Sequence, residues 1–304
     1  MIDIIVISGP TASGKTGVSI ELSKLMNIEI ISADSRQVYK YLDIGTAKVT
    51  TEERAAVRHH YIDFLMPDEY YSSGVFGDDA YQTVQEIHSR GAVPVVVGGS
   101  GLYVKALCEG LFEEEFDANR LAIREQIEAE AAEHGIEFLY QTLKETDPMS
   151  AELYKDMNPR RIIRALEYYR STGNVFSEAH KTFAKQRDLN PSYFGIDYPR
   201  QKLYERINLR SELMWKNGIV EETEKVLAMG YSPALNSLNT VGYKEAIAYL
   251  KGEMSSNDAL EKLKQNTRRY AKRQLTWFRR YDEMKWIAGS EKDIAQHIYS
   301  NFIG

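Results

Sequence analysis

The sequence predicts an α/β fold, a P-loop NTPase-like parallel sheet flanked by helices and carrying an all-helical insertion module. Three observations predict it. Short Val/Ile runs alternate with helical patterns in the first third of the chain, a glycine-rich loop follows the first run, and a stretch rich in Ala, Glu, Leu and Arg then interrupts the alternation. Continuous apolar runs separated by helices are typical of parallel strands buried on both faces.

The expected strands are residues 4–7, 29–32, 92–97 and, after the insertion, 192–197, with helical patterns at 15–26 and around 78–89. The composition of the sequence changes at an acidic cluster formed by Glu113, Glu114, Glu115 and Asp117. We therefore divide the chain into the first part of a P-loop core (1–115), a helical module (116–191) and the remainder of the core (192–304). That remainder is expected to be helical, with breaks at Gly218, 230–233 and Gly252.

Composition excludes several classes of protein. Of the 304 residues, 43% are hydrophobic and 27% charged, which excludes wholesale disorder, and no apolar run approaches the ~18–20 residues that cross a bilayer. The first residues lack the basic region and cleavage site of a signal peptide. Cys108 is the only cysteine, which excludes an intramolecular disulfide framework and a Cys-rich metal site and fits the reducing cytoplasm. The net charge of −6 argues against indiscriminate nucleic-acid binding by the whole surface.

Residues 9–16 match the phosphate-loop pattern G-x-x-x-x-G-K-[ST], with a strand before them and a helix after them. In such a loop, backbone N–H groups and a helix N-terminus converge on a polyphosphate, the lysine neutralises terminal oxygens, and the Ser/Thr hydroxyl ligates Mg²⁺. The pattern predicts a phosphate-bearing ligand and leaves open whether that ligand is ATP. The predicted ligand-binding residues are Gly9, Pro10, Thr11, Ala12, Ser13, Gly14, Lys15 and Thr16, with Thr16 as the metal ligand.

Two further predicted strands end in segments with candidate functional residues, at the same predicted edge of the sheet. The run at 30–34 ends in Asp34, which from its position is a metal ligand, a general base, or a residue that caps a turn. The run at 95–101 ends in a glycine-rich turn that contains Ser100. Ligands bind at the carboxyl edge in open α/β folds, so we expect both turns to border the site.

Several blocks together resemble the tRNA dimethylallyltransferases (isopentenyl-tRNA transferases). Besides GPTASGKT these are DSRQVY at 34–39, DIGTAK at 43–48, VGGSGLY at 97–103, NPRRIIRALE at 158–167, VGYK at 241–244 and TRRYAKRQLTW at 267–277. They occur in the family's order and cover nearly the whole chain. Ser100 stands where the family often has Thr, and Val49 where it often has Pro. The eukaryotic branch of the family carries a C-terminal zinc finger. A single cysteine is too few for such a finger, so the likeness is to the bacterial form.

The resemblance implies transfer of a dimethylallyl group from dimethylallyl diphosphate to N6 of the adenine immediately 3′ of the anticodon in tRNA, with release of pyrophosphate. The phosphate loop then holds the diphosphate of a prenyl donor. Asp34 matches the family's general base, and Arg210, in the segment RINLR at 206–210, matches its diphosphate-contacting arginine. Lys15, Arg210, and Thr16 through Mg²⁺ are expected to stabilise the leaving group.

An acidic protein that binds tRNA must concentrate its positive charge. Residues 262–280 hold eight Lys and Arg and no acid, and Arg269, Lys272 and Arg273 share one helical face. We expect the neighbouring Trp277 and Phe278 to belong to the core. The resemblance assigns the helical module to the anticodon stem-loop. The complete set of predicted tRNA contacts is Asp34, Ser35, Arg36, Gln37, Ser100, Arg124, Pro159, Arg160, Arg161, Ile162, Ile163, Val241, Gly242, Tyr243, Lys244, Arg268, Arg269, Lys272 and Arg273.

Three alternatives remain open at this point: a small-molecule kinase that uses ATP, an adenylate isopentenyltransferase, and a non-catalytic RNA-binding protein. The second does not need the helical module, and the third leaves the loop, Asp34 and Arg210 without a purpose. A metal site at His59, His60, Asp63 and His88 is disfavoured because the spacing matches no standard site. Cys108 is expected to be a buried apolar residue. We expect a cytoplasmic monomer with no membrane association.

Overall fold

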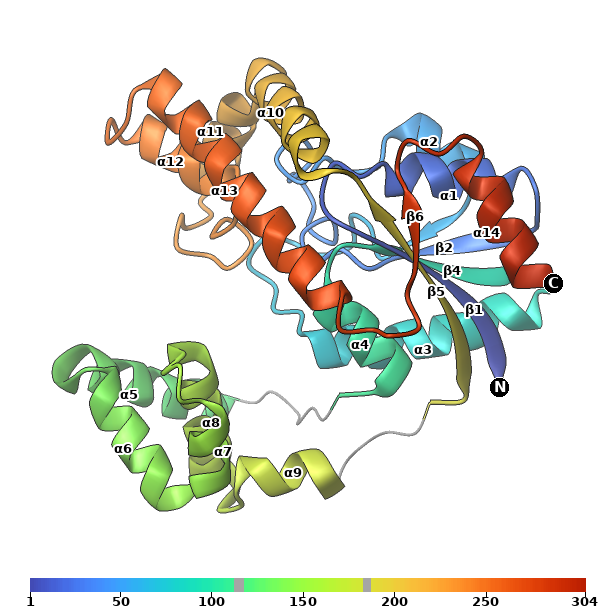
Figure 1. Cartoon of the computed structure of the whole chain (residues 1–304). Coiled ribbons are helices and arrows are strands. Elements are labelled where there is room, and N and C mark those ends of the chain that lie inside the picture. Colours follow the sequence, from blue (N-terminus) through green and yellow to red (C-terminus); the bar gives the residue numbers. More distant parts are fainter. Residues whose placement is uncertain (112–117, 183–186) are drawn as a thin grey trace. The chain divides into compact units, whose positions relative to one another are not determined.

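The computed structural model describes residues 1–111, 118–182 and 187–304 (Figure 1). It divides into two compact units. The first, which we call the core unit, joins residues 1–108 to 187–304, and the second, the helical module, comprises residues 109–186. The predicted boundary at 115/116 lies outside the described residues.

The core unit contains a parallel sheet with the strand order β3-β2-β4-β1-β5-β6. Every neighbouring pair of strands runs in the same direction, so their carboxyl ends meet at one edge. This confirms the predicted parallel α/β sheet. The strands are β1 (Ile2–Ser8), β2 (Ile28–Ser32), β3 (His59–His60), β4 (Val93–Gly98), β5 (Leu189–Asp197) and β6 (Lys285–Ala288).

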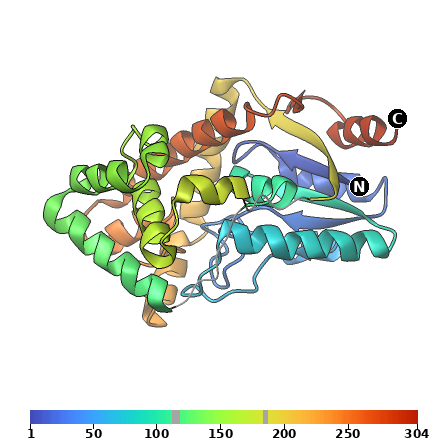
Figure 2. The ribbon, with the colours of Figure 1, turned by 90° about the horizontal axis from the view of Figure 1, so that it is seen from below.

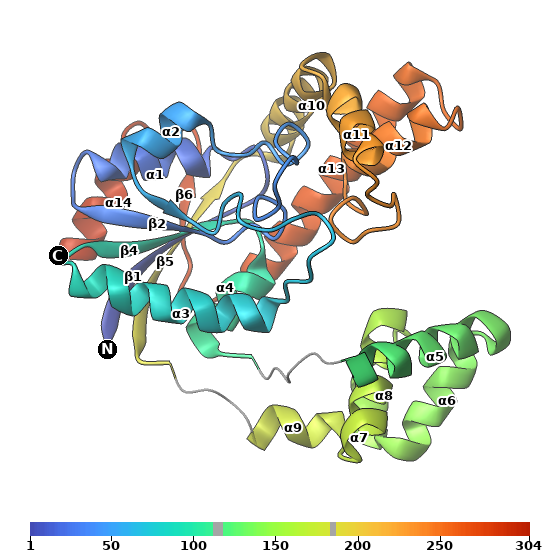
Figure 3. The ribbon, with the colours of Figure 1, turned by 180° about the vertical axis from the view of Figure 1, so that it is seen from behind.

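Alternate residues of β1 enter two separate hydrophobic clusters, because successive side chains of a strand point to opposite faces. Ile4 packs with Phe76 on one face, and Ile5 packs with Leu22 and Ile298 on the other. Figures 1 and 3 show α1 (Lys15–Ser23) and α14 (Ile294–Ile303) together on one face of the sheet, opposite α3 (Ser73–Ser89). Figure 2, a view of the same ribbon from below, shows α3 lying along the strands. Two shorter helices, α2 (Thr51–Ala56) and α4 (Gly101–Glu109), complete this part.

Four further helices of the core unit gather beyond the carboxyl ends of the strands (Figure 1). The longest, α13, packs against both α10 and α12 and reaches back to the start of α4. There, a Cβ on Gly101 would lie 2.0 Å from Cδ1 of Trp277, so only glycine allows this approach. The four are α10 (Arg200–Lys216), α11 (Ile219–Ala228), α12 (Tyr243–Leu250) and α13 (Ser256–Phe278).

The helical module has its own core, formed by Ile127, Leu139, Leu143, Ile162 and Leu166. A buried ion pair joins α5 to α8, with Nε of Arg120 donating to Oε1 of Glu167 at 3.0 Å. Its helices are α5 (Ala118–His134), α6 (Ile136–Thr146), α7 (Pro148–Leu153), α8 (Pro159–Thr172) and α9 (Phe176–Thr182).

Two strands differ from the sequence prediction. β5 begins at Leu189, inside the segment assigned to the module, because Leu189 and Pro191 pair with Ile2 and Ile4 of β1. β6 lies in a part expected to be helical. It is a four-residue edge strand in which only Ile287 is buried, too short to show a periodic pattern. No helix in the described ranges is long and apolar enough to cross a membrane.

One carboxylate holds the loop that carries the DIGTAK block against α11. Oε2 of Glu222 accepts the backbone N–H groups of Asp43 (3.0 Å) and Ile44 (2.8 Å), and Oε1 accepts that of Gly45 (3.1 Å). The hydroxyl of Tyr243 also donates to Oε1, at 2.6 Å. A Cβ on Gly45 would lie 2.4 Å from the Tyr243 ring. The loop is therefore fixed by side chains that lie almost two hundred residues further along the chain.

Replacing this carboxylate tests how much it stabilises the fold. Glu222→Ala leaves three N–H groups and a buried tyrosine hydroxyl without their acceptor, so we expect the free energy of unfolding to fall by ~2–4 kcal/mol. Denaturant titration measures the change. Glu224→Ala, an exposed position on the same helix, is the matched control and is expected to change stability by less than about 0.5 kcal/mol. Equal effects of the two substitutions would contradict the assignment.

Candidate active site

The phosphate loop connects the end of β1 to the start of α1. Ala12 and Gly14 both have left-handed backbone conformations, with φ values of 64° and 94°. Left-handed residues alternating with right-handed ones turn successive N–H groups toward one point, which creates an anion-binding concavity. Gly9 has a φ of 146°, and a Cβ there would lie 2.6 Å from the carbonyl oxygen of Ile196 in β5. The loop therefore has the form that phosphate binding requires.

The ammonium of Lys15 lies against this loop, where it donates to the carbonyl oxygens of Gly9 (3.0 Å) and Pro10 (2.8 Å). The pKa of Lys15 is lowered to about 7, first by desolvation and then by the positive charge of Arg210, while the carboxylate of Asp34 opposes both effects. The pKa of Arg210 is itself lowered by burial, while Asp34 raises it. The fold thus brings together two cations and one carboxylate that are far apart in the sequence.

Asp34 follows β2 and stabilises the turn after it. Its Oδ1 accepts the backbone N–H groups of Arg36 (2.9 Å) and Gln37 (3.4 Å). The turn is packed against the glycine-rich turn after β4, since the N–H of Ser100 donates to the carbonyl of Ala33 at 3.1 Å. Asp34 therefore caps a turn and also lies at the site, so the capping interpretation is compatible with a role as metal ligand or as general base.

A buried glutamine on α13, which is not among the residues predicted from the sequence, joins the phosphate loop to the glycine-rich turn. Oε1 of Gln274 accepts the N–H of Thr11 at 2.8 Å, and its Nε2 donates to the carbonyl of Gly99 at 2.9 Å. A Cβ on Gly99 would lie 2.0 Å from that Nε2. Gln274 belongs to the TRRYAKRQLTW block, but an uncharged side chain among cations gives no signal of its own.

Two tyrosines lie within the electrostatic influence of Asp34, and the side chain of nearby Gln37 is bonded to backbone. Burial raises the pKa of Tyr270, and the charge of Asp34 raises it further. Burial likewise raises the pKa of Tyr103, to which Asp34 again contributes. The side chain of Gln37 is buried, and its Nε2 donates to the carbonyls of Thr46 (3.4 Å) and Ala47 (3.2 Å). The charge of Asp34 therefore acts on the hydroxyls of two aromatic residues of the core unit.

The predicted tRNA-binding residues of the core unit divide by exposure. On α13 the side chains of Arg269, Lys272 and Arg273 are exposed, whereas that of Arg268 donates to Oδ1 of Asn208 at 2.6 Å. Phe278 is fully buried and Trp277 packs against the core. The remaining predicted tRNA-binding residues of the core unit differ in the same way. Half-buried side chains are those of Ser35, Arg36, Ser100 and Val241, while Gly242 is buried and Lys244 is exposed.

Two predicted contacts are incompatible with direct recognition by their side chains. Tyr243 is fully buried and bonded to Glu222, and Ile162 is fully buried in the core of the helical module. Their apolar surfaces stabilise the two units instead. The other predicted residues of the module are Pro159, Arg160 and Arg161, which are exposed, Ile163, which is half-buried, and Arg124, whose Nε donates to Oε1 of Glu128 at 2.9 Å.

The residues at the phosphate loop fit a hard cation together with an anion. The hydroxyls of Ser8 and Ser13 are buried and have no hydrogen-bond partner within the described ranges. Thr16, whose hydroxyl is the predicted metal ligand, stands in the first turn of α1, and oxygen ligands are those that suit Mg²⁺. Nowhere in the described chain does a group of three or more His, Cys, Asp or Glu lie so that it could hold a metal ion.

The segment around His59 and His60, whose spacing disfavours a metal site, has structural partners within the fold. Nε2 of His60 lies 2.7 Å from Oε2 of Glu29, and Nδ1 of His59 lies 2.8 Å from the carbonyl oxygen of Val57. Asp63 pairs with the buried ammonium of Lys48 at 2.7 Å. Cys108 is half-buried and packs against the core.

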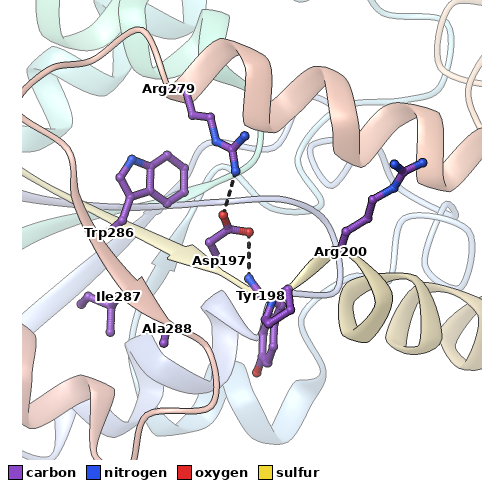
Figure 4. A pocket seen from close by; sticks show the side chains of 8 residues that line it. Asp197, Tyr198, Arg200, Arg279, Trp286, Ile287 and Ala288 are labelled. Carbon is purple, nitrogen blue, oxygen red and sulfur yellow. Dashed lines mark hydrogen bonds and ion pairs between the residues drawn. The ribbon is translucent and has the colours of Figure 1, made fainter.

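A shallow pocket of about 390 Å³ lies where β5 and β6 end and α10 begins (Figure 4). Asp197 organises it, since Oδ2 accepts from Arg279 at 3.1 Å and Oδ1 accepts the N–H of Tyr198 at 2.7 Å. Trp286 and Arg200 complete its wall (Figure 4). Because β5 also supports the phosphate loop at Gly9, this wall is part of the same scaffold.

Comparisons with known proteins agree with the geometry. The model of the family described as IPP transferase matches residues 37–281. A tRNA dimethylallyltransferase of Caldanaerobacter subterraneus is 43% identical over 94% of this chain and 91% of its own length. Another, of Acetivibrio thermocellus, is 44% identical over 99% of this chain and 96% of its own.

Solved structures are similar over the whole chain. The tRNA isopentenylpyrophosphate transferase of Bacillus halodurans is 38% identical, with a TM-score of 0.72 over 100% of this chain and 95% of that one. A eukaryotic dimethylallyltransferase acting on tRNA is 27% identical, with a TM-score of 0.82 over 100% of this chain and 80% of that one. With a phosphate loop, an adjacent carboxylate and relatives of this similarity along nearly its full length, the chain belongs to the IPP transferase family.

Proposed function

We propose that this protein transfers a dimethylallyl group from dimethylallyl diphosphate to N6 of the adenine immediately 3′ of the anticodon in tRNA, releasing pyrophosphate. One observation carries the proposal. The charges of Lys15, Arg210 and Asp34 converge at the phosphate loop of a chain whose relatives, 43–44% identical, are tRNA dimethylallyltransferases.

The loop and its cations act on the leaving diphosphate. Negative charge grows on the bridging oxygen as the bond to the allylic carbon breaks, and donors already aimed at that position lower the barrier. In this chain the donors are the loop N–H groups, the ammonium of Lys15 and the guanidinium of Arg210. Mg²⁺, held through the hydroxyl of Thr16, would supply further neutralisation of the diphosphate.

Asp34 acts on the acceptor. The exocyclic amine of adenine is a weak nucleophile, because its lone pair is delocalised into the ring, and its proton must leave as the new C–N bond forms. The hydrogen bonds of the turn fall on Oδ1 of Asp34, and Oδ2 is the oxygen that we assign to accept the proton. The half-buried ring of Tyr270, whose pKa the charge of Asp34 helps to raise, is the flat surface that we assign to an adenine turned out of its loop.

The tRNA partner is recognised by two surfaces. The exposed cations of α13 suit phosphates of the acceptor, and the exposed Arg160 and Arg161 on the helical module suit its anticodon stem-loop. We place the reaction in the cytoplasm, where the substrate occurs, and propose that the protein acts as a monomer.

The acceptor specificity and the role of Asp34 are tested together. We expect purified protein with Mg²⁺ and labelled dimethylallyl diphosphate to label an unmodified tRNA whose anticodon is followed by adenine, and to leave AMP and ATP unlabelled. Asp34→Ala removes the proton acceptor, so turnover should fall by ~10²–10⁴-fold while tRNA affinity changes much less. Filter binding with the same tRNA measures the affinity.

Other outcomes would redirect the proposal. Label in AMP or ATP indicates an adenylate isopentenyltransferase. Phosphoryl transfer that appears only with ATP as donor indicates a kinase. Near-full turnover by Asp34→Ala contradicts the assignment of the base and leaves the reaction itself standing.

The lowered pKa of Lys15 predicts proton uptake when pyrophosphate binds. In the free protein this pKa is about 7, and an adjacent anion raises it, so binding at pH 8 should add close to one proton and affinity should fall as the pH rises above about 7. Calorimetric titrations with Mg²⁺–pyrophosphate in buffers of different ionisation enthalpy measure the uptake. Lys15→Met corrects for protonation of the ligand, and an uptake unchanged in this variant would contradict the prediction.

The exposed cations of α13 predict a salt-dependent contact with tRNA. The double variant Lys272→Ala/Arg273→Ala should weaken tRNA binding and reduce the slope of log K against log salt by ~1–2, because each phosphate contact releases counterions. Binding titrations from low to physiological salt give the slope. Lys202→Ala, an exposed cation on α10, is the control, and pyrophosphate affinity should be the same in all three proteins. A slope unchanged in the double variant would place the tRNA elsewhere.

A further inference from the structure

The phosphate loop contains a residue whose conformation must be held from outside. Ala12 has a φ of 64°, which a residue with a Cβ adopts at a cost of ~1 kcal/mol or more and keeps only where the surroundings enforce it. The carbonyl oxygen of Ala12 accepts a hydrogen bond from Nε of Arg206 at 2.8 Å. This donor comes from α10, 194 positions further along the chain.

The guanidinium of Arg206 is itself fixed in place. Its central carbon lies 4.7 Å from the ring centroid of Tyr198, a cation–π contact. That ring is packed so closely that a Cβ on Gly289 would lie 2.0 Å from its Cε2. A Cβ on Gly14 would lie 3.8 Å from a terminal nitrogen of Arg206, so the guanidinium extends along the outside of the loop from residue 12 to residue 14.

We propose that Arg206 is a positioning residue that holds the phosphate loop in its anion-binding conformation by fixing the carbonyl of Ala12. It differs in role from Arg210, one helical turn further along α10, to which we assign direct stabilisation of the diphosphate. The inference extends the proposed function, because it names the residue on which the diphosphate site depends for its shape.

The energetic consequence follows from the loop's conformational equilibrium. When only part of the population has the binding-competent conformation, the apparent dissociation constant rises by the inverse of that fraction. A loop without the bond to Ala12 relaxes away from the left-handed conformation, and its N–H groups no longer converge. Affinity for a diphosphate therefore falls even when every group that contacts the ligand is present.

Three substitutions separate the hydrogen bond from the charge. Glutamine places an N–H donor at the position of Nε, one bond beyond Cδ, but carries no charge. Lysine retains a positive charge but has a methylene at that position, and methionine has neither donor nor charge. A positioning role predicts that Arg206→Gln binds Mg²⁺–pyrophosphate within about threefold of the wild-type protein, whereas Arg206→Lys and Arg206→Met bind about tenfold or more weakly.

Calorimetry with inorganic pyrophosphate and Mg²⁺ measures the ranking on the full chain, and thermal unfolding verifies that each variant is folded. If the methionine variant does not fold, the comparison of lysine with glutamine decides alone. A better affinity for Arg206→Lys than for Arg206→Gln means that Arg206 acts by charge and overturns the proposal. Four equal affinities, or a glutamine variant as weak as the methionine variant, overturn it as well.

A double variant examines the conformation of Ala12 directly. Glycine adopts a positive φ without penalty, so Ala12→Gly in the Arg206→Met background should recover part of the lost affinity, by about threefold or more. A merely structural role of Arg206 elsewhere in α10 predicts no recovery, and that result would overturn the proposal. Lys202→Gln, an exposed position on the same helix, is the matched control.

The results of these pyrophosphate-binding experiments can be distinguished from a failure of the proposed function. Pyrophosphate binding requires no prenyl transfer, so the ranking at residue 206 can be measured whichever reaction the protein performs. Wild-type protein that binds pyrophosphate but labels no tRNA contradicts the reaction and leaves this inference to be judged by the ranking alone.

Discussion

Close approach of backbone to backbone at the carboxyl edge of the sheet is the constraint on which the site depends. A Cβ on Gly98 would lie 2.0 Å from the carbonyl oxygen of Ala33, and one on Gly9 would lie 2.6 Å from that of Ile196. The turns after β1, β2 and β4 therefore meet each other and the end of β5 without intervening side chains. This packing brings the phosphate loop and Asp34 to the same edge.

Helices from the last third of the chain then brace the turns from outside. Gln274 of α13 bonds the phosphate loop and the glycine-rich turn, and Arg206 of α10 bonds the loop on another side. Glu222 of α11 does the same for the loop at 43–45. All three bond to backbone groups. The C-terminal helices thus fix the geometry of the turns through side-chain bonds to their backbone.

The charges of the site are arranged for a reaction that releases an anion. Burial lowers the pKa of Lys15 below that of an isolated lysine, and repulsion from the second cation near the loop, Arg210, adds to this effect. An anion in the loop would relieve that repulsion, so the electrostatic energy of the free site favours a negatively charged ligand. Asp34 lies close enough to raise both pKa values and thus belongs to the same electrostatic unit.

The sequence by itself determined the parallel sheet, the phosphate loop, the helical module and the family, because these depend on local patterns: apolar runs, glycine spacing and ordered motif blocks. It also indicated the basic face of α13. Only the tertiary structure decided that Gln274 and Arg206 hold the loop, that Tyr243 and Ile162 are core residues, and that 285–288 form a strand. The physical reason is that each of these depends on a partner far away in the chain. A neutral amide, a buried tyrosine or a four-residue edge strand carries no local signal of which distant backbone it will meet.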